Sequence, residues 1–141
     1  MTEGPQPKLL LVEDSEDDVY FFRRALEKSG MNCILQCAAN GEEAIEFLQT
    51  VSKTQSVPPI MFLDLKMPVL NGFEVLDWLQ TQPFVAQIRV IVLSGSERED
   101  DKVRAAKLGA TEYLVKPVRV ADFHRLLREI CAATPEIGAH V

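Results

Sequence analysis

The sequence has few cysteines and histidines and no long hydrophobic run, and these shortages exclude several classes of protein. No apolar segment approaches the roughly 20 residues that a membrane-spanning helix needs. Residues 1–7 lack the charged and then apolar pattern of a secretion signal. Acidic residues outnumber basic ones by 21 to 15, and the net charge of −6 argues against nucleic-acid binding. We therefore expect a cytoplasmic protein that binds neither a membrane nor nucleic acid.

The cysteines are odd in number, and the chain is not a small disulfide scaffold. They are Cys33, Cys37 and Cys131. No histidine lies near Cys33 and Cys37 to complete a metal site. We expect all three cysteines to be reduced and buried, as is usual in the cytosol. The two histidines, His124 and His140, are expected to be structural or solvent-exposed.

Five short apolar runs alternate with amphipathic segments of helical periodicity. The runs predict strands at residues 8–12, 33–38, 60–65, 89–95 and 111–117, and the amphipathic segments predict helices at residues 15–30, 40–48, 71–81, 96–110 and 120–134. This alternation predicts an α/β fold, a flavodoxin-like (βα)5 doubly wound parallel sheet with strand order 2-1-3-4-5. We expect one domain at residues 8–131, a disordered lead-in at 1–7 and a frayed tail at 132–141.

Four of the predicted helices start with a Ser or Asn that is followed by an acidic residue three positions later. This spacing is typical of a capping box. The pairs are Ser15 with Asp18, Asn40 with Glu43, Asn71 with Glu74, and Ser96 with Glu99. Asp17 and Asp18 are accordingly expected to stabilise a helix N-terminus and not to bind metal.

Polar residues stand where the predicted strands end. Glu13 and Asp14 follow the first strand, Asp64 ends the third, Ser94 lies near the end of the fourth and Lys116 near the end of the fifth. In parallel α/β sheets, sites form beyond the carboxyl ends of the strands, where the strand order reverses. The predicted order makes strands one and three neighbours at that point, so three carboxylates are expected to meet there.

Three close carboxylates repel one another unless a cation lies between them, and Mg²⁺ is a hard cation that takes such ligands together with phosphate oxygens. A lysine and a hydroxyl beside them suit the stabilisation of a transferring phosphoryl group. Asp64 would then be the nucleophile and would form an aspartyl phosphate. Each residue by itself is also compatible with an ordinary strand-end charge or turn residue.

The segments LLVEDSEDD, FLDLKMPVLNGFEVL, VIVLSGS and YLVKPV together resemble the receiver domain of two-component response regulators. The resemblance implies that Asp64 accepts phosphate from a phosphohistidine on a sensor histidine kinase. It implies that Asp14 and Asp64 bind Mg²⁺, with Glu13 acting through water and the Lys66 backbone carbonyl as a further ligand. The resemblance therefore implies a phosphoacceptor that assists its own phosphorylation and dephosphorylation, and not an enzyme.

The resemblance also assigns the readout of the phosphate. Ser94 and Lys116 would contact the phosphoryl oxygens, Ser94 and Tyr113 would form the switch pair, and the bond before Pro117 would be cis. We expect a stand-alone receiver, similar to the small regulators paired with bacterial phytochromes, with a phytochrome as the candidate kinase.

The surface of the fourth helix, fifth strand and fifth helix is expected to mediate homodimerisation or docking of a downstream protein. A plainly solvated face is the alternative. The charged residues of this surface are Arg98, Asp100, Asp101, Arg104, Lys107, Arg119, Asp122 and Arg125.

Three other functions compete with this interpretation. A flavodoxin-like electron carrier would need a phosphate-binding first loop, and here that loop is the acidic EDSEDD. A phosphatase with an aspartyl nucleophile commonly has a second Asp where this chain has Lys66. A phosphate-independent binding module would not need Asp14, Asp64, Ser94 and Lys116 together.

Overall fold

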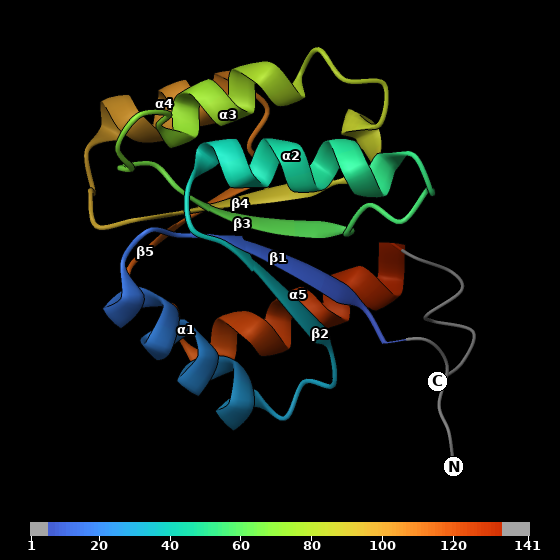
Figure 1. Cartoon of the computed structure of the whole chain (residues 1–141). Coiled ribbons are helices and arrows are strands. Elements are labelled where there is room, and N and C mark those ends of the chain that lie inside the picture. The colour runs from blue at the N-terminus through green and yellow to red at the C-terminus, as the bar shows by residue number, and fades with distance from the viewer. Residues whose placement is uncertain (1–5, 134–141) are drawn as a thin grey trace.

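A computed structural model describes residues 6–133, in which strands and helices alternate along the chain (Figure 1). The strands are β1 (Lys8–Val12), β2 (Ile34–Ala38), β3 (Ile60–Asp64), β4 (Arg89–Ser94) and β5 (Glu112–Val115). The helices are α1 (Glu16–Ser29), α2 (Gly41–Ser52), α3 (Gly72–Leu79), the 3-10 turn η1 (Val85–Gln87), α4 (Glu99–Lys107) and α5 (Val120–Ala133). Of the lead-in predicted at 1–7, residues 1–5 lie outside the described residues, and the Pro7 carbonyl accepts from the Ile34 N–H at 2.9 Å. Of the tail predicted at 132–141, residues 134–141 lie outside the described residues, and residues 132–133 belong to α5.

All five strands pair in parallel in the order β2-β1-β3-β4-β5, as predicted. The side chains of β1 point alternately to the two faces of the sheet, and each face has its own hydrophobic core. Leu9 and Leu11 pack on one face of the sheet, and Leu10 and Val12 pack on the other. Both faces are covered, which explains why the central strands are continuous apolar runs.

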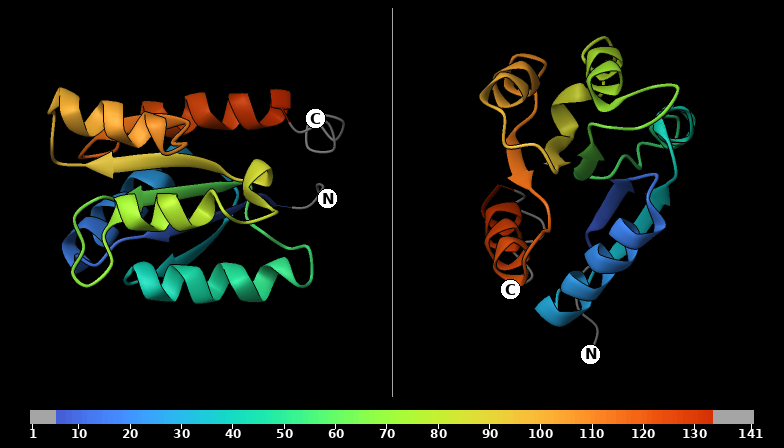
Figure 2. Two further views of the ribbon diagram at one scale, coloured as in Figure 1. Left: turned by 90° about the horizontal axis from the view of Figure 1, so that it is seen from above. Right: turned by 90° about the vertical axis from the view of Figure 1, so that its left-hand side faces the viewer.

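The helices form a layer on each face of the sheet, with α2, α3 and α4 on one side and α1 and α5 on the other (Figures 1 and 2). Phe22 of α1, Phe62 of β3 and Phe123 of α5 meet edge to face, with ring centroids 4.9, 5.1 and 5.9 Å apart. These contacts hold α1 and α5 against the sheet. Among the helices at residues 6–133, none has the length and apolar character of a membrane span.

Three of the four predicted N-caps form, but the full capping box, in which the acidic side chain accepts from the N-cap N–H in return, is present only at Asn71 and Glu74. Glu43 accepts from the N–H of Ala39 instead. In each of the three N-caps, the side-chain oxygen of Ser15, Asn40 or Asn71 accepts a hydrogen bond from a backbone N–H three residues later. The capping box predicted at Ser96 is wrong, because α4 begins at Glu99 with Arg98 as its uncapped N-terminal neighbour. The Ser96 hydroxyl instead donates to Asp101 at 2.7 Å.

The prediction of buried cysteines is wrong for Cys37, which is exposed because β2 is an edge strand. Cys33 is half-buried, and burial raises the pKa of its thiol. The side chain of Cys131 and the whole of His140 lie outside the described residues. His124 has a structural contact, with Nε2 2.8 Å from a backbone carbonyl oxygen of α1.

Candidate functional site

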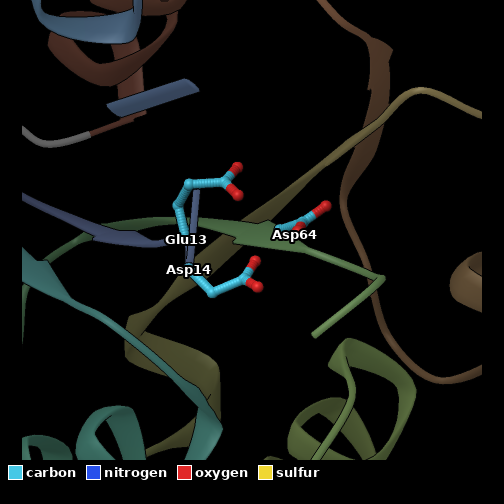
Figure 3. A group of neighbouring side chains, drawn as sticks. All are labelled: Glu13, Asp14 and Asp64. Carbon is cyan, nitrogen blue, oxygen red and sulfur yellow. The ribbon is translucent and has the colours of Figure 1, made fainter. Parts of the chain in front are cut away.

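The carboxyl ends of β1 and β3 bring three acidic side chains together (Figure 3). Each of Glu13, Asp14 and Asp64 has a carboxylate oxygen within 4.8 Å of such an oxygen on the other two. Glu13 and Asp64 are 4% exposed, whereas Asp14 is exposed to solvent. The cluster therefore has a buried floor and one side that is open to solvent, and it forms at the reversal of strand order where the sequence predicts it.

The loop after β3 is held close to Asp64 by a glycine. A Cβ atom at Gly72 would lie 2.5 Å from the Asp64 carbonyl oxygen, so only glycine allows α3 to approach this closely. The Gly72 N–H donates to the carbonyl of Leu65 at 3.0 Å. In the same loop Val69 has φ of 69° and is 83% exposed. A left-handed backbone is costly for a β-branched residue, so this tight turn stores strain beside the site.

Lys116 reaches the cluster from the end of β5. Its Nζ lies 2.9 Å from Glu13, 3.2 Å from Asp64 and 2.7 Å from Asp18 of α1. The contact with Asp18 was missed by sequence reasoning, which assigned that carboxylate to the N-terminus of α1 alone. The Lys116–Pro117 peptide bond is cis.

Burial and charge set the pKa values of this cluster. Burial raises the pKa of Glu13 to about 7, against the hydrogen bond with Lys116, and the nearby charge of Asp64 raises it further. Burial likewise raises the pKa of Asp64, opposed by Lys116 and by a backbone hydrogen bond from Lys66. Burial lowers the pKa of Lys116, but the hydrogen bonds with Asp18 and Glu13 outweigh it and the pKa is raised. One ammonium thus leaves the carboxylates under-neutralised, and a hard divalent cation suits such a donor set.

The raised pKa of Glu13 predicts how stability depends on pH without metal. Between pH 4.5 and about 7 the folded protein retains a proton that the unfolded chain has lost. Stability should therefore fall as pH rises through this window. Glu13→Gln should remove most of this slope, a change on the order of 2 kcal/mol between pH 5 and 8. Denaturant unfolding with a metal chelator measures it.

Glu46→Gln, which alters an exposed carboxylate on α2, is the control for this measurement and should keep the parent's slope. Added Mg²⁺ should oppose the loss at higher pH, because metal binding requires deprotonated carboxylates. An identical slope in the parent and in Glu13→Gln would contradict the assignment.

Ser94 and Tyr113 are connected through Ser96. Ser94 is fully buried, and its Oγ accepts from the Ser96 N–H at 3.0 Å. The Tyr113 hydroxyl donates to the Ser96 carbonyl at 2.9 Å. Ser96 therefore contacts both residues of the predicted switch pair. Sequence reasoning treated Ser96 as a helix cap and so missed this connection.

The charged residues predicted on the α4–β5–α5 surface divide into different environments. Arg104 stacks on Phe73 at 4.0 Å from its ring centroid and so faces α3. Arg125 is paired with Glu112 of β5 and with Glu129 of its own helix. Both arginines therefore have partners within the chain, which makes them less available to a partner protein.

The model of the response regulator receiver domain matches residues 9–128. The chain belongs to the response regulator receiver family. Response regulator Rcp1 of Synechocystis sp. is 31% identical over 129 residues, which are 90% of this chain and 88% of that protein. A structure of Rcp1 in its Mn²⁺-bound form matches with a TM-score of 0.70 and 31% identity, and covers 89% of this chain and 91% of that one.

Two further solved structures are phytochrome response regulators. The bacteriophytochrome response regulator AtBRR has a TM-score of 0.75 and 31% identity, and the match covers 88% of this chain and 91% of that one. The phosphorylated cyanobacterial phytochrome response regulator RcpA has a TM-score of 0.73 and 29% identity over 89% and 91%. The receiver acts in two-component phosphorelay, and receiver domains pair with histidine kinases. The electron-carrier and phosphate-independent alternatives are not favoured.

Proposed function

We propose that Asp64 accepts a phosphoryl group from the phosphohistidine of a sensor histidine kinase. The convergence of Glu13, Asp14, Asp64 and Lys116 at the switch point carries this proposal. A carboxylate oxygen of Asp64 attacks the phosphorus as the phosphorus–nitrogen bond breaks. The histidine keeps the electron pair of that bond. Because Asp64 itself is modified, the protein is a phosphoacceptor that assists its own reaction.

Glu13, Asp14 and Asp64, with the Lys66 backbone carbonyl, would hold Mg²⁺. When bound, Mg²⁺ polarises the phosphoryl oxygens and neutralises charge that develops during transfer. The proximity of the three carboxylates and the burial of two of them support this assignment. The test is incubation with acetyl phosphate and Mg²⁺, or with acetyl phosphate and a chelator, followed by intact-mass measurement. Phosphorylation should appear only with Mg²⁺.

The partner that delivers phosphate is proposed to be a sensor kinase of the phytochrome type. Apolar side chains exposed near the site support docking of a protein. Tyr20 and Phe21 of α1 are 53% and 58% exposed, and Val69, in the loop that follows Asp64, is 83% exposed. Phe21 also lines a cavity of about 190 Å³ that Lys116 borders. Apolar groups so close to a charged site are typical of a protein contact.

The output is proposed to pass through the α4–β5–α5 surface. Ser94 would donate to a phosphoryl oxygen, and this would disturb its bond with the Ser96 N–H. Ser96 also anchors Tyr113 and Asp101, so β5 and the start of α4 would respond together. On α4, Lys102 lies 5.9 Å from the Tyr113 ring centroid and Val103 is 44% exposed. This surface is proposed to pair two copies or to bind a downstream protein.

Val103→Glu should weaken phosphorylation-dependent self-association or partner binding by about tenfold or more, since it places a charge in an apolar contact. Sedimentation with and without trifluoroberyllate, a phosphoryl mimic, measures self-association. Thr50→Glu on α2 adds the same charge far from this surface in the sequence and is the control. If the two variants self-associate equally with and without trifluoroberyllate, the surface does not mediate the output.

A further inference from the structure

Asp18 occupies the third position of α1, yet its carboxylate does not cap the helix. In α3 the corresponding residue, Glu74, accepts from the N–H of its N-cap Asn71 at 2.9 Å. In α1 that N–H, of Ser15, donates to Glu13 at 3.2 Å instead. The carboxylate of Asp18 is thereby free to reach Lys116, 98 residues away in the sequence, at 2.7 Å.

The Lys116 ammonium has as many carboxylate neighbours as it has hydrogens to donate. An ammonium carries three N–H donors. Its neighbours Glu13, Asp18 and Asp64 lie at 2.9, 2.7 and 3.2 Å. The contact with Asp18 is the shortest of the three. A phosphoryl oxygen that binds Lys116 must therefore compete with carboxylates already in place.

Asp18 is the neighbour that Lys116 can release most easily. Its side chain is 38% exposed, whereas the side chains of Glu13 and Asp64 are 2% and 5% exposed. Solvent can therefore hydrate a released Asp18 carboxylate. Asp18 and Lys116 also line the cavity of about 190 Å³ between α1 and the loop after β5, which provides space for the movement.

We propose that Asp18 is a positioning residue that competes with the phosphoryl group for Lys116 and so restrains phosphorylation of Asp64. The inference rests on the proposed role of Asp64. Its sign follows from charge. The phosphoryl group adds negative charge beside Lys116. The Asp18 carboxylate offsets part of the positive charge of Lys116, which would otherwise stabilise the phosphoryl group. It also repels the negative charge of the phosphoryl group directly. Removal of the Asp18 charge should therefore favour the phosphorylated state.

Asp18→Asn keeps the shape of the side chain and removes its charge. We expect it to bind trifluoroberyllate in the presence of Mg²⁺ about two- to fivefold more tightly than the parent, since the pair is partly exposed. Calorimetric titration measures this affinity. The rate of phosphorylation by acetyl phosphate should rise in the same direction. Asp18→Ala should show the same sign, and Asp18→Glu, which restores the charge, should return the affinity toward that of the parent.

Asp17→Asn is the matched control, because it removes the same charge from the same turn of α1 at an exposed position. A general effect of helix charge would change both variants equally. Affinity in Asp18→Asn that equals Asp17→Asn, or falls below the parent, would overturn the inference and leave the role of Asp64 intact. If the parent itself fails to bind the mimic with Mg²⁺, the proposed function fails, and this inference fails with it.

Discussion

Replacement of Asp64 by Asn is expected to reduce phosphorylation by acetyl phosphate and Mg²⁺ to the background level. The amide oxygen of Asn cannot form an acyl phosphate, and it carries no charge with which to attack phosphorus. The change is nearly isosteric, and in the metal-free protein it removes one of three mutually repelling carboxylates. The variant should therefore remain folded, with stability at pH 8 equal to or above that of the parent.

Intact-mass measurement after incubation with the phosphodonor tests this expectation, and denaturant unfolding shows that the variant is folded. Asp77→Asn is the control, because Asp77 is an exposed carboxylate on α3 and its loss should leave phosphorylation unchanged. A full phosphoryl adduct on Asp64→Asn would show that another residue accepts the phosphoryl group. An adduct lost equally in both variants would point to a general effect of charge.

The fold could be predicted because each local signal agrees with the tertiary structure. Residues 9–12 are all apolar, so both faces of this strand carry apolar side chains, and β1 is indeed covered on both faces. The cluster of Glu13, Asp14 and Asp64 could be placed because it depends only on strand ends and strand order. Such features follow from the backbone path and need no knowledge of side-chain packing.

The features that the sequence did not predict depend on long-range side-chain contacts. Ser96 looks like a helix cap, but the chain runs two residues further before α4 begins, and its backbone instead joins Ser94 to Tyr113. Asp18 looks like the second half of a capping box, yet Lys116 competes for its carboxylate more strongly than the helix N-terminus does. The capping-box spacing considers only hydrogen-bond partners within the first turn of a helix. It cannot include a partner such as Lys116, which comes from another part of the chain.

Lys116→Ala is expected to separate phosphorylation from its consequences. Phosphate uptake by Asp64 should persist at a reduced rate, because the nucleophile and the acidic cluster remain. The change in self-association on phosphorylation should be largely lost, because the ammonium proposed to pair with the phosphoryl group is absent. Sedimentation with trifluoroberyllate, compared with intact mass after acetyl phosphate, separates the two effects.

The same change should destabilise the metal-free protein by about 3 kcal/mol at pH 8, because it leaves the buried carboxylates of Glu13 and Asp64 without their cation. The loss should be smaller at pH 5, where the raised pKa lets folded Glu13 hold a proton. Added Mg²⁺ should restore part of it. Lys53→Ala, at an exposed lysine after α2, should change neither stability nor response. A Lys116→Ala protein that responds to the mimic as the parent does would show that the signal leaves Asp64 without Lys116.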